Sequence, residues 1–158
     1  MTEQSDLETF RSEVDRWLDD NFPATLAHAA RRAVVDEDPE LADHLELWRS
    51  RLAAAGYGAP TWPREYGGAG LTGAEAAVLA EAMTAVGAFN PIPTFAGMGV
   101  TMVGPTVLEY GTDEQKSRHL PGMASGEVRW CLGLSEPNSG SDLASLSTRD
   151  VKTNVGFN

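Results

Sequence analysis

Residues 130–146 read WCLGLSEPNSGSDLASL, and this stretch governs how the rest of the chain is interpreted. Alternating positions in and just before it are apolar: Val128, Trp130, Leu132 and Leu134. Alternation with a period of two is typical of a β-strand. Residues 137–142, Pro-Asn-Ser-Gly-Ser-Asp, are strong turn formers. We therefore expect a strand that ends near Ser135 and is followed by a tight turn.

The turn at residues 137–142 concentrates hydrogen-bond donors. Its backbone N–H groups and hydroxyls converge on one small space, which suits a phosphate or the edge of a flavin. Taken alone, the same six residues are also compatible with an ordinary hydrophilic turn. Neither Ser135 nor Ser141 has the G-x-S-x-G setting of a hydrolase nucleophile, so that chemistry is not expected.

The chain before this stretch carries helical patterns. A first helix is predicted between a cap at Ser5 or Asp6 and a stop at Pro23, from apolar residues three and four apart: Leu7, Phe10, Val14, Trp17 and Leu18. A second apolar stripe ends at Gly56 and consists of Leu41, Leu45, Trp48 and Leu52. Both stripes are interpreted as core.

Residues 56–71 hold too many glycines and prolines for a regular element, and their three aromatic residues favour an ordered loop. Thr72 and Glu75 then stand at the spacing of a capping box. The alanine-rich residues 74–86 after them favour a helix.

Two more helical segments follow. Pro91 and Pro93 open an apolar helix that is expected to run to about Tyr110. Thr112 and Gln115 repeat the capping-box spacing and start a short helix that Pro121 is expected to interrupt. These and the preceding patterns predict a mainly α chain, with a helical domain at residues 1–126 and the start of an incomplete β-domain at residues 127–158.

Composition limits the function classes. The chain has 158 residues, of which 12 are Lys or Arg and 23 are Asp or Glu, giving a net charge of −11. This charge repels a phosphate backbone and excludes nucleic-acid binding. Cys131 is the single cysteine, so the sequence offers no disulfide or cysteine metal cluster. The three histidines lack metal-ligand spacing. With no signal peptide or apolar span in the sequence, we expect a cytoplasmic protein.

Three segments, in this order, resemble the acyl-CoA dehydrogenase family. The first is the glycine-rich loop at residues 56–70, and the second is residues 110–127, which begin Tyr-Gly-Thr-Asp-Glu-Gln. The third is residues 130–146. The resemblance implies a helical bundle of the family's N-terminal type, followed by the first strand or strands of its β-domain.

This resemblance also implies roles for individual residues. FAD is the implied cofactor, and the positions that would contact it are Leu132, Leu134, Ser135, Gly140 and Ser141. Ser141 would also approach the CoA part of the substrate, while the acyl chain would be lined by Phe95, Met98 and Met102. On periodicity alone, those last three residues are interpreted as ordinary packing.

The implied activity is α,β-dehydrogenation of an acyl-CoA thioester, with electrons passing on to an electron-transfer flavoprotein. In the family a carboxylate removes the α-proton and the flavin accepts hydride from the β-carbon. That base is a glutamate in a C-terminal helical domain, so no catalytic residue is assigned here. Glu136 is interpreted as part of the turn. The resemblance fades after Arg149, and we expect a truncated family member that is inactive alone.

An alternative function remains open. The chain is compatible with a non-catalytic helical module, or remnant, that self-associates through an exposed apolar face. Under either hypothesis we expect a homo-oligomer or an association with another acyl-CoA dehydrogenase-like chain. Bound flavin that survives gel filtration would favour the enzyme, and a colourless oligomer would favour the module.

Overall fold

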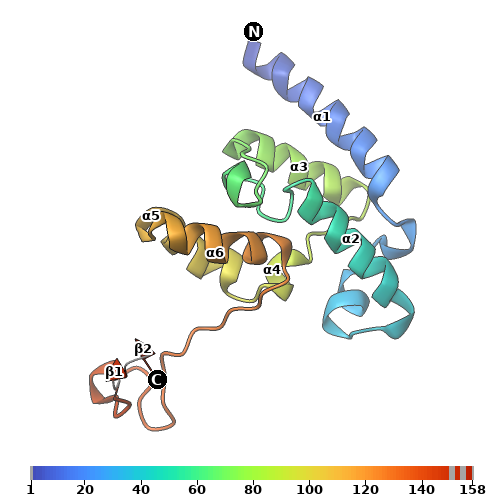
Figure 1. Ribbon diagram of the computed structural model, residues 1–158. Helices are drawn as coiled ribbons and strands as arrows, with labels where there is room; N and C mark the ends of the chain where they lie inside the picture. The colour runs from blue at the N-terminus through green and yellow to red at the C-terminus, as the bar shows by residue number, and fades with distance from the viewer. Residues whose placement is uncertain (1, 150–151, 154–155, 158) are drawn as a thin grey trace.

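The structure, a computed structural model, describes residues 2–149, 152–153 and 156–157, and side chains for residues 4–149. Its described part is mainly helical, as predicted (Figure 1). The α-helices are α1 (Thr2–Asn21), α2 (Ala42–Ala54), α3 (Gly73–Ala85), α4 (Ile92–Phe95), α5 (Gly104–Tyr110) and α6 (Asp113–Ser125). No helix among the described residues is long and apolar enough to cross a membrane.

Helix α1 packs on α3, and the main core lies between these helices and α2. The buried side chains of this core include Val14, Leu18, Leu45, Trp48, Leu52, Leu79, Ala82, Met83 and Ile92. All the apolar positions predicted for α2 are buried. Because α1 begins at Thr2, Ser5 and Asp6 lie inside the helix, and the prediction that one of them is its N-cap was wrong.

Trp48 is the largest fully buried side chain. Its indole N–H donates to the carbonyl of Phe89 at 2.7 Å, so burial leaves no unpaired donor. Its ring centroid lies 4.9 Å from that of Phe22 and 5.6 Å from that of Trp17. Trp48 therefore joins α1, α2 and the chain that enters α4.

A second cluster packs α6 against the glycine-rich loop at residues 56–71, and its buried members are Ala59, Trp62, Leu120, Met123 and Ala124. The loop is ordered, as expected. Its Gly70 N–H donates to the Trp62 carbonyl at 2.9 Å. A Cβ at Gly68 would stand 2.1 Å from that carbonyl oxygen, so only glycine permits this close return.

Both predicted capping boxes are confirmed. The Thr72 hydroxyl accepts from the Glu75 N–H at 3.2 Å, and the Glu75 carboxylate accepts from the Thr72 N–H at 2.8 Å. Thr112 and Gln115 make the same pair of bonds at the start of α6. Capping satisfies backbone donors that have no partner within the helix.

Helix α6 continues through Pro121, so the expected interruption was wrong. Proline removes one helical hydrogen bond and crowds the preceding turn. Here Leu120 precedes the proline and Met123 and Ala124 follow it, and all three side chains are at most 1% exposed. We infer that burying residues on both sides of Pro121 outweighs the lost bond.

The helix expected from about Pro91 to Tyr110 is broken. Helix α4 ends at Phe95, a π-helical turn η5 (Gly99–Val103) follows, and α5 begins at Gly104. The break centres on Gly97, which has φ 61°. There the chain receives a distant segment, because the Met98 N–H donates to the Trp130 carbonyl at 3.1 Å.

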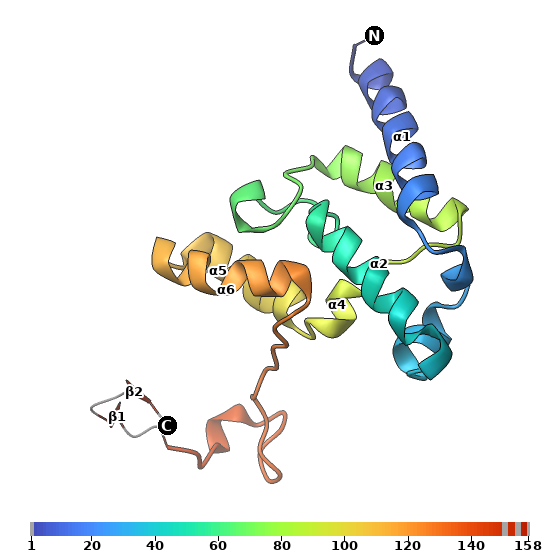
Figure 2. The ribbon, with the colours of Figure 1, turned by 45° about the vertical axis from the view of Figure 1, so that its right-hand side comes forward.

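The strand expected to end near Ser135 is reduced to one isolated parallel bridge, between Trp130 and Gly97, and residues 131–135 continue without ladder bonds among the described residues. A strand needs a neighbour to accept its backbone bonds. The named strands are instead β1 (Lys152–Thr153) and β2 (Gly156–Phe157), which pair antiparallel. Both views show the chain running away from the helical body after α6 (Figures 1 and 2).

Candidate functional site

The predicted flavin-contacting segment begins at Trp130, where the chain leaves the helical body. The Trp130 N–H donates to the Ala96 carbonyl at 2.9 Å, and its carbonyl accepts from Met98. Residues 131–135 make no backbone hydrogen bond within the described part of the chain. Leu132 and Leu134 are 43% and 53% exposed. The segment is therefore anchored at one end and uncovered along its length.

A closed turn follows this extended segment. Glu136 and Ser139 exchange backbone hydrogen bonds at 2.9 and 3.0 Å. The Glu136 carboxylate also accepts from the N–H groups of Ser147 and Thr148, at 2.9 and 2.7 Å. Hydrogen bonding, chiefly from the Thr148 side chain and then from these two N–H groups, lowers the pKa of Glu136. Glu136 therefore acts as an anion that ties residues 136–148 into a loop.

Ser139 is the buried centre of the loop, with an exposed fraction of 3%. Its hydroxyl donates to the Asp142 carbonyl at 2.6 Å and accepts from the Ser145 hydroxyl at 3.1 Å. Sequence reasoning missed Ser139, although its place between two turn formers was a signal. The predicted contacts Gly140 and Ser141 lie exposed beside it.

Ser135 precedes the loop and is exposed, so its hydroxyl is accessible. At Gly140 an added Cβ would meet no heavy atom within 4 Å. The packing of the loop therefore does not require glycine at this position. Glycine would be required at position 140 only if a ligand or another chain approached its backbone closely.

Of the three predicted acyl-chain residues, Phe95 ends α4, Met98 directly precedes η5 and Met102 lies on η5. Met98 and Met102 are 39% and 48% exposed, whereas Phe95 is half-buried and lines a cavity of about 250 Å³ with Val34 and Leu45. The backbone pairing with Trp130 brings Met98 to the start of the extended segment.

The structure does not bring all the predicted residues together. Within the described part of the chain, no hydrogen bond joins residues 131–149 to a helix. Of the predicted acyl-lining residues, Met98 is the one that is hydrogen-bonded to the segment carrying the predicted flavin contacts, through Trp130 at its start. The acyl-lining and flavin-contacting roles remain predictions, since a complete pocket would need a second wall.

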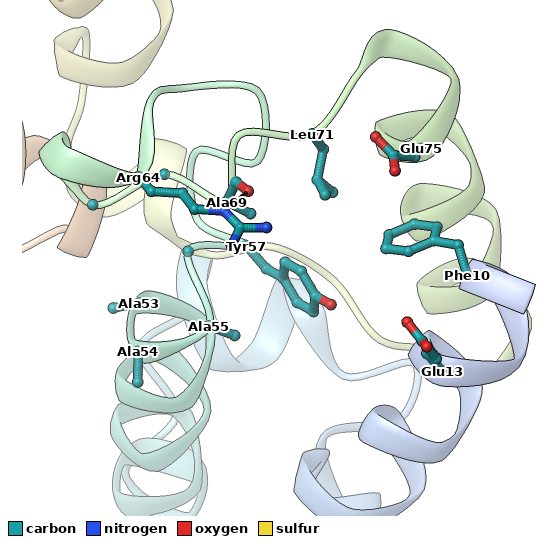
Figure 3. Close-up of a pocket in the computed structure, with 13 residues that line it drawn as sticks. Phe10, Glu13, Ala53, Ala54, Ala55, Tyr57, Arg64, Ala69, Leu71 and Glu75 are labelled. Atoms are coloured by element: carbon teal, nitrogen blue, oxygen red, sulfur yellow. Dashed lines mark hydrogen bonds between the residues drawn. The ribbon is translucent and has the colours of Figure 1, made fainter. Parts of the chain in front are cut away.

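A larger cavity lies elsewhere, among α1, the end of α2, the glycine-rich loop and the start of α3 (Figure 3). None of the residues predicted to contact flavin or substrate lines it.

Comparisons with known proteins converge on one family. The family model described as acyl-CoA dehydrogenase, N-terminal domain, matches residues 4–127. The acyl-CoA dehydrogenase IpdE1 of Mycolicibacterium smegmatis is 38% identical over 143 residues, which is 90% of this chain and 36% of the relative. IpdE1 of Mycobacterium tuberculosis is 36% identical over 143 residues, which is again 90% of this chain and 36% of the relative. The chain thus spans little more than a third of the length of these relatives.

Solved structures give the same result. The Tcur3481-Tcur3483 steroid ACAD aligns with a TM-score of 0.60 and 34% identity, covering 97% of this chain and 37% of that one. The ChsE4-ChsE5 complex from Mycobacterium tuberculosis aligns with a TM-score of 0.59 and 31% identity, covering 99% and 36%. Both likenesses extend beyond the residues that the family model matches.

Proposed function

Because the chain belongs to the acyl-CoA dehydrogenase family, we propose that it contributes one wall of an FAD site at which an acyl-CoA thioester is dehydrogenated between its α- and β-carbons. The observation that carries this proposal is the extended segment at residues 131–135. It combines exposed leucines with backbone groups that have no partner among the described residues. Uncovered apolar side chains beside unpaired backbone donors suit a flat, polar-edged ligand.

The residues present fit one face of a flavin. Leu132 and Leu134 are two positions apart in an extended segment, so they project to the same side, about 6.6 Å apart along the chain. This spacing suits a fused aromatic ring system. The Ser135 hydroxyl and N–H follow directly and would donate to the polar edge of the ring. A single segment supplies a wall and not an enclosed pocket.

The turn after Ser135 would hold the phosphate end of the ligands. Gly140 leaves room for close approach to its backbone, and Ser141 adds an exposed hydroxyl donor. The carboxylate of Glu136 and the hydroxyl of Ser139 are both used inside the loop, where they fix its shape. Preorganised donors lose little conformational entropy on binding.

Bound FAD would supply the hydride acceptor for the reaction. The residues of this chain would orient the flavin and, through Met98 and Met102, contact the acyl chain. Glu136 is poorly suited to remove the α-proton, because its carboxylate accepts two backbone hydrogen bonds and its pKa is lowered. We assign the base to the glutamate of the family's C-terminal helical domain, outside these 158 residues.

The second wall would come from further acyl-CoA dehydrogenase-like polypeptide. The Tcur3481-Tcur3483 and ChsE4-ChsE5 structures are each named for two proteins, which supports association with a second chain of the same family or with another copy. In the cytoplasm, an electron-transfer flavoprotein would then reoxidise the flavin.

The test is a titration of the isotope-labelled chain with FAD, followed by amide NMR shifts. We expect weak binding that perturbs residues 132–141, is lost on gel filtration, and gives no flavin reduction when acyl-CoA is added. Leu134→Asp should abolish the perturbation, whereas Leu146→Asp, at a similarly exposed leucine, should leave it unchanged. A colourless oligomer with no perturbation at residues 132–141 would instead favour the non-catalytic module.

A further inference from the structure

The cavity among α1, the end of α2, the glycine-rich loop and the start of α3 has a volume of about 640 Å³, within the range that small-molecule sites occupy. Figure 3 shows side chains from two sides of the molecule turned toward it. The end of α2 and the glycine-rich loop form one side, and α1 and the start of α3 form the other. Its defining side chains are Phe10, Glu13, Tyr57, Arg64, Leu71 and Glu75.

Much of the wall is apolar. Phe10 and Leu71 are half-buried and pack against the main core, and residues 53–55 at the end of α2 are alanines. Such a wall is shaped for an aliphatic body rather than for water alone. An alkyl group laid against it would gain about 0.8 kcal/mol for each CH₂ that it buries.

Arg64 and Glu75 also line the cavity and carry opposite charges. The Arg64 Nε donates to the Ala69 carbonyl at 3.0 Å. The Glu75 carboxylate accepts from both the N–H and the hydroxyl of Thr72 at 2.8 Å. Hydrogen bonding from Thr72, followed by the charge of Arg64, lowers the pKa of Glu75. No ion pair joins Arg64 to Glu75 among the described residues, but their formal charges cancel, so Glu13 supplies the net negative charge of the lining.

Glu13 differs from Glu75, because no described residue donates a hydrogen bond to its side chain or forms an ion pair with it. The Tyr57 hydroxyl is turned toward Glu13 (Figure 3). Burial, and then the charge of Glu13, raises the pKa of Tyr57. The Tyr57 ring is held by an edge contact with Trp17, at 4.9 Å between centroids. Glu13 is exposed, and its carboxylate thus stands at the cavity without an ion pair among the described residues, beside a fixed aromatic ring.

Two further features favour positive charge at this place. Helix α2 ends at Ala54, and the carbonyl end of a helix carries partial negative charge. Phe10 and Tyr57 line the cavity, and the face of an aromatic ring attracts a cation. Carboxylate, carbonyl end and aromatic rings therefore all favour a ligand with a cationic head.

We propose that this cavity binds a small primary alkylammonium, with its head between Glu13 and Tyr57 and its alkyl chain along Phe10 and Leu71. The site is independent of the proposed dehydrogenase activity, because it shares no residue with the predicted flavin wall. The cavity lies between the C-terminus of α2 and the side of α1, so the ligand would also bridge these two helices.

The test uses three probes with the same six-carbon body: hexylammonium, 1-hexanol and hexanoate, each titrated into the labelled chain at neutral pH. Hexylammonium should shift the amides of Glu13, Tyr57 and Leu71. Hexanol should bind about five- to tenfold more weakly, because it lacks the charge–charge and cation–π contributions. Equal binding of hexanol, or tighter binding of hexanoate, would overturn the proposal.

A matched pair of variants on α1 makes the test specific. Glu13→Gln should lower hexylammonium affinity to the level of hexanol, whereas Asp20→Asn removes the same charge outside the cavity and should leave affinity unchanged. An equal loss in both variants would mean that general chain charge, and not the site, attracts the probe. Tighter binding of Nα-acetyl-lysine N-methylamide than of hexylammonium would overturn the assignment to a free small molecule.

Discussion

The helical body, residues 2–126, and the segment at residues 131–149 are held in different ways. The body has two buried clusters and long-range side-chain bonds such as that from Trp48 to Phe89. In the segment, Ser139 is the one described residue that is buried. The hydrogen bonds of residues 131–149 join residues within the segment itself. Burial stabilises the first region, whereas the second offers its apolar side chains for contact.

This difference predicts where substitutions unfold the protein. Changes in the body should alter the free energy of unfolding, because they remove buried contacts. Changes in the segment should alter ligand or partner binding with little effect on unfolding, because its leucines are exposed.

The largest effect is expected at Trp48. Trp48→Ala should lower the free energy of unfolding by about 3–5 kcal/mol, because it leaves a cavity where three elements meet and orphans the Phe89 carbonyl. Urea denaturation measures this loss. In the segment, Leu146→Ala should change stability by less than about 0.5 kcal/mol. Similar losses at both positions would show that the two regions share one core.

The junction of the two regions should respond next. Gly97 has φ 61°, and a Cβ there would lie 2.5 Å from the Trp130 carbonyl oxygen. Gly97→Ala should therefore cost about 1–3 kcal/mol and release residues 128–135 from the body. Gly133→Ala is the matched control, since its Cβ would meet nothing within 4 Å. Amide exchange at Met98 and Trp130 would report the release.

A smaller loss is expected at the start of α3. Thr72→Ala removes one half of the capping box and should cost about 1 kcal/mol. Thr101→Ala, at an exposed threonine without a side-chain hydrogen bond among the described residues, should cost less than about 0.5 kcal/mol. Thermal unfolding of the two variants separates these outcomes. An unchanged melting temperature for both would show that the Thr72 cap does not stabilise the fold.

Local patterns predicted most of the body. The spacing of apolar residues located α2 and the core side of α1, and Thr72 and Thr112 marked two helix starts. The break at Gly97 could not be predicted in this way, because it depends on a carbonyl from Trp130, far along the chain. The continuation of α6 through Pro121 could not be predicted for the same reason, since the burial of the residues around Pro121 is a property of the whole fold.

The candidate site was predictable only as a set of positions. Glu136 was correctly interpreted as part of the turn, and this interpretation came from the family resemblance. The internal role of Ser139 depends on the carbonyl of Asp142 and the hydroxyl of Ser145, whose positions follow from loop closure. Whether Leu132 and Leu134 contact a flavin depends on a second wall, which the alternation of residues does not encode.

The smallest effect concerns pH and is confined to the segment. Because the pKa of Glu136 is lower in the folded loop than in an unfolded chain, its bonds to Ser147 and Thr148 are complete above the ordinary glutamate value, about 4.3. They are lost as pH falls through the lowered folded value. The amide shifts of Ser147 and Thr148 should therefore titrate together, with a midpoint below the ordinary pKa of glutamate. Glu136→Gln should abolish this titration and leave urea unfolding of the helical body unchanged. A parallel loss of body stability would contradict the separation of the two regions.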